Sequence, residues 1–436
     1  MSVNKKIGLL AVTSLVVGSQ IGSGILLLPA SLASFGGIGV STWFITATGA
    51  LLLAFVFARL CAKIPKTGGP HNYIEAAFGH TPAFFSAWTY WLISWISTTA
   101  VIIAIVGYLH PIFGNAEPQT NLMLELIILL FITILNILGV RTAAWMEFVF
   151  SSLKVLPLII VPLAGLAFIN MDHFVPFNPT GESPLTALNA AALLTLWGFI
   201  GVESATTPAG SVENASKTIP KAIIAGTSLV AIIYILNTFV IMGVIPPAHL
   251  SHSKAPFADA AAIIFGGNWY ILISIAAAIV CLGTLNAWVL TSGQIALGAA
   301  NDGHLPKIFK LKNKFNAPIT SLLISSLGMV PFLILTLDVN LINQVNKIID
   351  ISVTAFLFVY VMSTLSYIKL FWKDPVRNAI DYRALIIGVS ALVFCGWALW
   401  SSGLKTVGLA LIITLTGVPI YLWRRKGQFI KKTKPA

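Results

Sequence analysis

The chain has 436 residues, of which 57% are hydrophobic and only 9% are charged, and its formal net charge is +12. An ordinary soluble domain carries about 25% charged residues, and a chain this poor in charge cannot cover a soluble surface with polar groups. The composition therefore excludes a soluble enzyme and a disordered chain. The basic residues stand between apolar runs, which excludes a nucleic-acid-binding domain as well and indicates an integral membrane protein.

Apolar segments of membrane-spanning length follow one another along the whole chain. A bilayer core about 30 Å thick requires about 20 apolar residues per helix, and no segment shows the alternation of a barrel strand. The pattern predicts an all-α integral membrane protein with twelve transmembrane helices. They are expected near residues 8–33, 38–62, 84–110, 121–140, 148–169, 187–211, 221–245, 269–298, 318–337, 345–370, 384–401 and 405–423.

The first of these segments follows a short basic N-terminus, as a signal peptide does. It runs beyond signal length to about residue 33 without a small-residue cleavage site. We therefore expect it to be retained as a membrane helix.

Basic residues predict the orientation of the helices. Twelve spans put both ends on one side, and if that side is the cytoplasm, 22 of the 26 Lys and Arg residues fall in cytoplasmic segments. Lys254, Lys347 and Lys405 fall outside, and Lys154 lies within a span. This predicts a multi-pass protein of the bacterial inner membrane with cytoplasmic termini. The basic tail 424–436 is interpreted as a topology anchor, and binding to anionic lipids is the weaker alternative.

The first and sixth segments contain polar, glycine-rich interruptions at 18–25 and 197–204. They begin two successive blocks of five helices, and such paired interruptions point to a transporter built from inverted repeats. Unwound backbone in lipid costs several kcal/mol per free polar group, so it persists only where it lines a cavity. The alternative is that Gly18 and Gly22 form a helix-packing motif.

The chemistry of such breaks suits an amino acid. Backbone N–H groups at the start of a half-helix bind a carboxylate, and freed carbonyl groups bind an ammonium group. Together the two breaks could hold the zwitterionic head of an α-amino acid.

Four side chains at membrane depth are candidates for function. Glu203 lies in the second break, where a carboxylate is costly and is expected either to take up a proton or to serve as a structural hydrogen-bond donor. Lys154 either extends its stem to the cytoplasmic edge or places its ammonium between helices. Trp197 and Trp288 lie near mid-span, where an aromatic face suits a cation, although core packing is the alternative.

Histidine and cysteine give no sign of a metal or a cofactor. The three cysteines are far apart and the seven histidines have no ligand-like spacing, so we expect neither a metal site nor a disulfide framework.

Several short motifs occur together in one order. They are Gly22-Ser23-Gly24-Ile25 with Leu28-Pro29-Ala30, then Gly68-Gly69-Pro70, Trp197-x-Phe199-Ile200-Gly201-Val202-Glu203-Ser204-Ala205, Pro256-Phe257 and Asn301-Asp302-Gly303-x-x-Pro306. In this combination the sequence resembles the amino acid–polyamine–organocation (APC) superfamily, and within it the basic amino acid/polyamine antiporters that include arginine/agmatine exchangers.

The resemblance implies the five-plus-five inverted repeat of the LeuT-like fold, with broken helices 1 and 6. The repeats would cover 8–169 and 187–370, two trailing helices 384–423, and the tail 424–436, in one transporter domain of 1–436. The substrate-binding positions it implies are Ser19, Ile21, Ser23, Gly24, Ser94, Thr98, Trp197, Ile200, Trp288 and Ser352. The gating or proton-coupling positions are Glu203, Tyr90, Tyr360 and Lys154, with both tyrosines toward the outer gate and Trp197 as a middle gate.

Some positions depart from the arginine/agmatine exchangers. Those relatives carry asparagine at the positions of Ser19 and Thr98, and Ala then Cys at the positions of Ile93 and Ser94, so the pocket here would be poorer in amides. Lys154 resembles a lysine that replaces a sodium ion in proton-coupled members of the superfamily.

These features predict a secondary transporter and not an enzyme. The leading hypothesis is exchange of an arginine-like cationic amino acid for its agmatine-like decarboxylated amine. The alternative is a proton-coupled symporter of neutral amino acids. An intramembrane enzyme or a channel is disfavoured, because Glu203 has no catalytic partner in the sequence and no filter segment repeats. The expected partners are the small-molecule substrate, protons, the lipid bilayer and a second copy in a homodimer, with no nucleic acid.

Overall fold

The computed structural model describes residues 6–114, 117–335, 341–374 and 379–424, and it is almost entirely helical. The first helices are α1 (Leu9–Gln20), α2 (Ser23–Ala33), α3 (Gly36–Lys63), α4 (Pro70–Phe78), α5 (His80–Ile96), α6 (Thr98–Phe113), α7 (Pro118–Ile137), α8 (Val140–Gly165) and α9 (Pro184–Trp197). The remaining ones are α10 (Ala215–Val244), α11 (Pro247–Leu250), α12 (Pro256–Phe265), α13 (Trp269–Asn301), α14 (Ile319–Leu335), α15 (Leu341–Phe371), α16 (Tyr382–Ser401) and α17 (Gly403–Leu415).

Short elements connect these helices. Single 3-10 turns occur at Leu166–Phe168, Met171–Phe174, Ser204–Thr206, Ala209–Ser211 and Lys307–Lys310. Two strands of two residues each, β1 (Lys373–Asp374) and β2 (Ala379–Ile380), pair in antiparallel fashion between α15 and α16.

The first membrane segment is interrupted where its glycines predict. α1 ends at Gln20 and α2 begins at Ser23, and Ile21 between them is extended, with φ −77° and ψ 101°. A Cβ atom on Gly22 would lie 2.6 Å from two atoms of the Thr284 side chain on α13. Glycine therefore lets the unwound backbone approach α13 at this point.

The second interruption follows Trp197, the last residue of α9. Turns occupy 198–203, and Gly201 has a φ of +109°, a conformation that favours glycine. The chain then returns to the N-terminal segment, because the Ile7 amide donates to the Ser211 carbonyl at 3.0 Å and the Glu213 amide donates to the Ile7 carbonyl at 3.0 Å. The residues after the second break thus run toward the N-terminal end of the chain.

Ten helical segments among the described residues are long and apolar enough to cross a membrane, and each coincides with one of the twelve predicted segments. The other two predicted segments, 187–211 and 318–337, contain α9 and α14, which are apolar but have only 14 and 17 residues. α9 is short because the turns after Trp197 end it. The basic tail from residue 425 onward lies outside the described residues.

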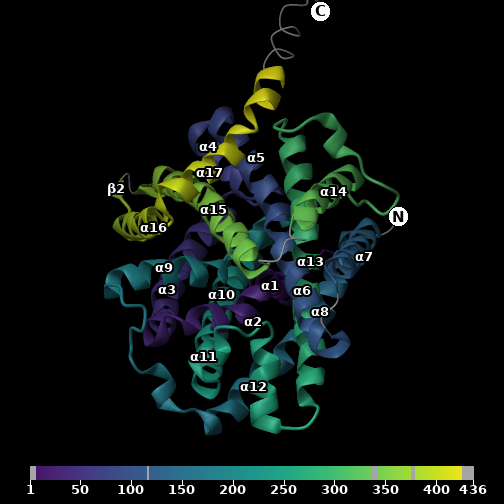
Figure 1. Ribbon diagram of the computed structural model, residues 1–436. Helices are drawn as coiled ribbons and strands as arrows, with labels where there is room; N and C mark the ends of the chain where they lie inside the picture. Colours follow the sequence, from purple (N-terminus) through teal and green to yellow (C-terminus); the bar gives the residue numbers. More distant parts are fainter. Residues whose placement is uncertain (1–5, 115–116, 336–340, 375–378, 425–436) are drawn as a thin grey trace, which may run out of the picture.

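α1 and α2, the two halves of the first broken segment, lie at the centre of the molecule (Figure 1). α10 packs along α3 and α1, and α13 packs along α6 and α8, so long helices enclose α1 and α2. Figure 1 also shows α4 and α17 together at one end and α11 and α12 at the opposite end. We call these the α4 end and the α12 end.

Candidate functional site

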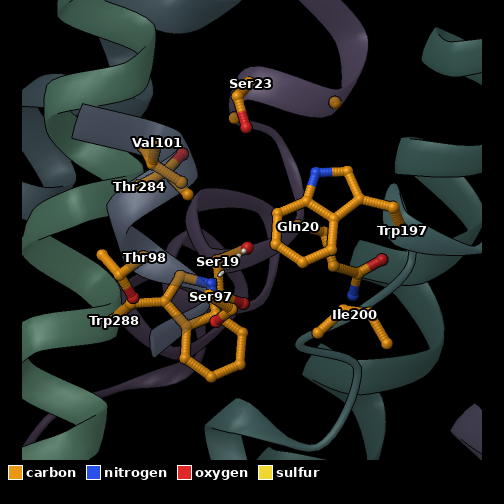
Figure 2. Close-up of a pocket in the computed structure, with 12 residues that line it drawn as sticks. Ser19, Gln20, Ser23, Ser97, Thr98, Val101, Trp197, Ile200, Thr284 and Trp288 are labelled. Atoms are coloured by element: carbon orange, nitrogen blue, oxygen red, sulfur yellow. Dashed lines mark hydrogen bonds between the residues drawn. The ribbon is translucent and has the colours of Figure 1, made fainter. Parts of the chain in front are cut away.

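A small pocket lies where the two interrupted segments meet. Its lining comes from both breaks and from the helices α6 and α13 beside them (Figure 2). The lining residues are Ser19, Gln20, Gly22, Ser23, Gly24, Ser97, Thr98, Val101, Trp197, Ile200, Thr284 and Trp288.

One wall of the pocket is the start of α2. Ser23 and Gly24 are its first residues, and no side chain caps this N-terminus. The first N–H groups of a helix have no acceptor within the helix, and they attract anions. A Cβ atom on Gly24 would lie 3.1 Å from Tyr234 Oη and 3.3 Å from Trp197 Cδ1, so glycine allows α9 to approach α2 here. The wall therefore suits a carboxylate.

Two tryptophans flank the pocket around Ser19, as Figure 2 shows. Trp197 closes one side and is 8% exposed. Trp288, on α13, donates from Nε1 to the Ser19 carbonyl at 3.1 Å, and its ring lies 5.5 Å from that of Phe356. Ser19 in turn links the two breaks, because its Oγ lies 3.2 Å from the Gly201 carbonyl and 2.7 Å from Ser204 Oγ.

Most of the predicted substrate positions meet at this pocket, and three do not line it. Ile21 directs its carbonyl toward Thr284 Oγ1, at 2.6 Å. Ser94 is buried and donates to the Trp91 carbonyl at 2.7 Å. The buried Ser352 Oγ has no hydrogen-bond partner among the described residues. These three positions stay predictions drawn from the resemblance.

Five lining residues were not predicted: Gln20, Gly22, Ser97, Val101 and Thr284. Gln20 and Gly22 stand inside the interrupted motif, which could have indicated them. Gln20 Nε2 donates to Thr227 Oγ1 at 3.1 Å, while its Oε1 is buried with no hydrogen-bond partner in the described part of the chain. An acceptor of this kind beside a pocket can receive a hydrogen bond from a ligand ammonium.

Lys154 is buried within the protein, so its stem does not extend to the membrane edge. Its Nζ donates to the carbonyls of Gly18 and Ile21 at 2.9 and 3.1 Å and lies 3.1 Å from Thr284 Oγ1. The ammonium therefore occupies a cation position that joins α8, the first break and α13.

Glu147 lies near the start of the predicted fifth span, where the sequence suggests an interfacial residue, but the structure buries it. Its side chain is 2% exposed, its Oε1 lies 3.7 Å from Lys154 Nζ, and its Oε2 accepts a hydrogen bond from Asn286 at 3.1 Å. A buried carboxylate requires such partners, because an isolated charge there is costly.

Glu203 and Tyr360 form the tightest polar contact beside the pocket. The Tyr360 hydroxyl donates to Glu203 Oε2 at 2.5 Å, and both side chains are buried. The Tyr360 ring lies 6.2 Å from Phe356, which contacts Tyr90 at 5.9 Å between ring centroids. Tyr90 and Tyr360 thus flank one phenylalanine that also contacts Trp288, and Glu203 joins this group through its hydrogen bond with Tyr360.

The two tyrosines are predicted to lie toward an outer gate. Beyond Glu203 the chain runs to Ile7, and the Gly68 amide, just before α4, donates to the Thr207 carbonyl at 2.9 Å. The tyrosines therefore lie on the side of the pocket that faces Ile7 and the start of α4. If the N-terminal segment is cytoplasmic, as predicted, this is the inner side, so the outer-gate expectation depends on that orientation and stays a prediction.

A second polar cluster lies at the α4 end, outside the pocket. Asp302 accepts from Lys66 at 3.1 Å and lies 3.1 Å from His71 Nε2, and these contacts hold its pKa below the ordinary value although burial opposes them. His304 lies 3.3 Å from Glu75. Burial, together with the neighbouring His71 and His80, lowers the pKa of His304 to about 4, so its imidazole is neutral at pH 7.

Apolar helices of membrane-spanning length, with a pocket where two of the predicted spans are interrupted, are the architecture of a membrane transport protein. The chain belongs to the amino acid permease family, whose sequence model matches residues 7–423. Within that family it groups with the basic amino acid/polyamine antiporters, so it is a transporter and not an enzyme, as predicted.

Individual relatives extend over almost the whole chain. The cadaverine/lysine antiporter of Escherichia coli strain K12 is 33% identical over 435 residues, covering 97% of this chain and 95% of its own length. The putrescine transporter PotE of the same strain is 30% identical over 428 residues, with 96% of each chain covered. PotE of Haemophilus influenzae is 29% identical over 425 residues, covering 96% of this chain and 97% of its own.

Proposed function

We propose that this protein exchanges a cationic amino acid for its decarboxylated amine across the inner membrane by alternating access. The observation that carries the proposal is the pocket between the two interrupted segments. The name of the cadaverine/lysine antiporter, which pairs an amino acid with its amine, supports it. The proposed architecture has twelve spans, with inverted repeats at 8–169 and 187–370, trailing helices at 384–423, and both termini cytoplasmic.

The proposed binding mode follows the polarity of the pocket. The substrate carboxylate contacts the N–H groups at Ser23 and Gly24, and the α-amino group lies at Ile200 and the backbone near it. Trp197 covers the bound head group. An amine that lacks the carboxylate gives up the contact with α2 and keeps the rest, so one site can carry both exchange partners in turn.

We propose an ammonium-ended pair, of the lysine/cadaverine type, ahead of arginine/agmatine. A guanidinium group favours planar acceptors that bind two of its N–H groups at once. Ser19 and Thr98 are hydroxyl residues, and Thr98 Oγ1 already donates to the Ser94 carbonyl at 2.6 Å. An ammonium group is satisfied by single acceptors such as Gln20 Oε1.

Counterflow in proteoliposomes tests this function. Vesicles are loaded with unlabelled lysine, cadaverine, arginine, agmatine or leucine, and entry of the labelled partner is followed without an ion gradient. We expect fast entry only with a cationic substrate inside, and faster exchange for lysine/cadaverine than for arginine/agmatine. Entry that does not depend on internal substrate contradicts an exchanger.

Lys154 supports a second candidate function, proton-coupled uptake of neutral amino acids. Its ammonium bridges the carbonyls of the first break, so its protonation is tied to the conformation of that break. In the same vesicles, leucine uptake driven by an inward proton gradient, with no requirement for internal substrate, supports symport. Leucine uptake that does not respond to the gradient contradicts it.

A further inference from the structure

Glu75, His80 and His304 bring three metal-ligating side chains together at the α4 end, and we call them the Glu75 cluster. Glu75 lies on α4, His80 begins α5, and His304 follows the end of α13. One ligand atom from each residue lies within 4.8 Å of the other two. The rings of His80 and His304 stack with centroids 4.3 Å apart, so both imidazoles face the same carboxylate from neighbouring positions.

The distances in the Glu75 cluster differ from those of ordinary hydrogen bonds. His80 Nδ1 lies 3.4 Å from Glu75 Oε1, and His304 Nε2 lies 3.3 Å from Glu75 Oε2. Normal N–H···O bonds span about 2.7–3.2 Å. Zinc binds His nitrogen at about 2.0–2.1 Å and carboxylate oxygen at about 2.0–2.2 Å, so two ligand atoms of a tetrahedral site are about 3.3 Å apart. Each imidazole nitrogen lies at about this distance from one Glu75 oxygen, and the three ligand atoms lie within 4.8 Å of one another.

The three side chains of the Glu75 cluster are buried to different degrees, and this arrangement suits a bound ion. The His304 side chain is fully buried, while those of Glu75 and His80 are 34% and 43% exposed. His304 Nδ1 is also buried and has no hydrogen-bond partner in the described ranges. The inner ligand is therefore fixed by packing, and the outer side stays open to solvent for entry of an ion and for a water molecule as a fourth ligand.

A separate group of polar side chains lies beside the Glu75 cluster. Lys66 and His71 both contact Asp302, at 3.1 Å each, which are normal distances for charge-assisted hydrogen bonds. The His71 ring also lies 5.5 Å from that of His304, so the two groups are neighbours, but Asp302 and not Glu75 is the carboxylate that holds Lys66 and His71.

We propose that Glu75, His80 and His304 bind a divalent transition-metal ion, Zn²⁺ in the first place, in a three-ligand site completed by water. Zinc and the neighbouring transition metals bind two imidazoles and one carboxylate more readily than calcium or magnesium does. A bound ion joins the α4–α5 connection to the segment after α13, 229 residues away in sequence. The proposal departs from the expectation, drawn from histidine spacing, that the chain has no metal site.

The test uses the full-length, tag-free protein in detergent, stripped with EDTA and titrated with Co²⁺ and then Zn²⁺. Co²⁺ reports its coordination in visible absorption, since four-coordinate Co²⁺ absorbs much more strongly than the six-coordinate aqua ion. We expect one Co²⁺ per chain with the four-coordinate spectrum, displaced by Zn²⁺. We also expect Zn²⁺ to raise the melting temperature of the protein.

The informative variant is His80→Ala, because this partly exposed side chain can be removed with little effect on packing. We expect it to weaken Zn²⁺ binding at least about tenfold and to abolish the Zn²⁺-dependent rise in melting temperature. His252→Ala is the matched control, an exposed histidine in the loop before α12, and we expect it to bind as the wild type does. Glu75→Gln, which keeps the shape of the side chain, should behave like His80→Ala.

Two results would overturn the proposal. One is a six-coordinate spectrum or no saturable binding in the wild type. The other is equal binding in His80→Ala and His252→Ala, which would place the ion elsewhere. The measurements need no transport substrate, so failure of the metal site is distinct from failure of the proposed exchange function.

Discussion

Trp197 is the residue whose role depends most directly on its ring, because it lies between the end of α9 and the pocket. Trp197→Leu keeps an apolar side chain but removes the aromatic face over the substrate ammonium. A cation over an aromatic ring in a desolvated site gains about 2 kcal/mol, so we expect substrate binding to weaken at least about tenfold. Titration of purified protein measures this. Trp400→Leu is the control, since Trp400 is 83% exposed, and equal affinities in the two variants would contradict the assignment.

Glu203 and Tyr360 predict a gate on the α4 side of the pocket. Glu203→Gln keeps the shape of the side chain and a hydrogen bond with Tyr360 of about 1 kcal/mol, but it removes the carboxyl group that can take up and release a proton. We expect the exchange rate to change by about tenfold, while the melting temperature shifts little. Glu117→Gln, in an exposed position before α7, is the control. An exchange rate within twofold of the wild type would remove Glu203 from the gate.

At the residue scale, the predicted positions included Ser23 in the first break and Trp288 on the facing helix α13, but they missed Gln20 and Gly22 inside the break. Ser23, Gly24 and Trp197 could be predicted because polar or bulky residues beside glycines interrupt an apolar run. Thr284 lies on the continuous helix α13, and Ser97 joins α5 to α6 within one predicted span, so nothing in the sequence says that either residue faces the pocket. Lys154 allowed two interpretations, and only its contacts with Gly18 and Ile21 decide between them.

At the element scale, Gly22 sets how closely the first break approaches α13. A methyl group added there would lie 2.6 Å from Thr284 side-chain atoms, which forces either the break or α13 to move. Overpacking of this kind costs about 1–3 kcal/mol, so we expect Gly22→Ala to lower the melting temperature and to abolish exchange. Gly107→Ala on α6 is the matched control, because nothing lies within 4 Å of its added Cβ. An unchanged Gly22→Ala transporter would show that the break does not need this approach.

The pair of Lys154 and Glu147 joins α8 to the first break and to α13. Lys154→Ala breaks the buried pair by removing the ammonium that faces Glu147, and breaking a buried pair costs about 3–5 kcal/mol. We expect a large fall in melting temperature, of which Glu147→Gln on the same chain recovers more than half. The four proteins of this double-mutant cycle are compared by thermal unfolding in detergent. Strictly additive effects would mean that the two side chains act independently.

The lengths of the helices show where the hydropathy pattern was sufficient to predict a membrane-spanning helix. Long apolar helices such as α3 and α10 matched their predicted segments, because composition alone decides whether such a helix can cross a membrane. α9 ends after 14 residues because Gly198 and Gly201 follow it, so hydropathy merged a helix and a run of turns into one segment. The glycines predicted the interruption but not its length.

At the scale of the whole molecule, the spacing of residues along the sequence could not predict contacts between distant parts of the chain. Glu75 and His304 lie 229 residues apart, and only the packing of α4 against the end of α13 brings them together. The orientation in the membrane can be predicted without knowing any such contact, because the prediction uses only the positions of basic residues along the chain.

That orientation gives a prediction for the intact cell. Lys312 and Lys254 are both exposed, and they lie on loops on either side of α13, which spans 33 residues. Each is replaced by cysteine, and cells are treated with a thiol reagent that does not cross the inner membrane. The three native cysteines are buried, so they contribute little background. With cytoplasmic termini, we expect Lys254→Cys to react from outside and Lys312→Cys to react only after the membrane is made permeable. The reverse pattern would mean that the protein has the opposite orientation in the membrane, which would place Tyr90 and Tyr360 on the outer side of the pocket. Reaction of both residues from outside would contradict α13 as a membrane span.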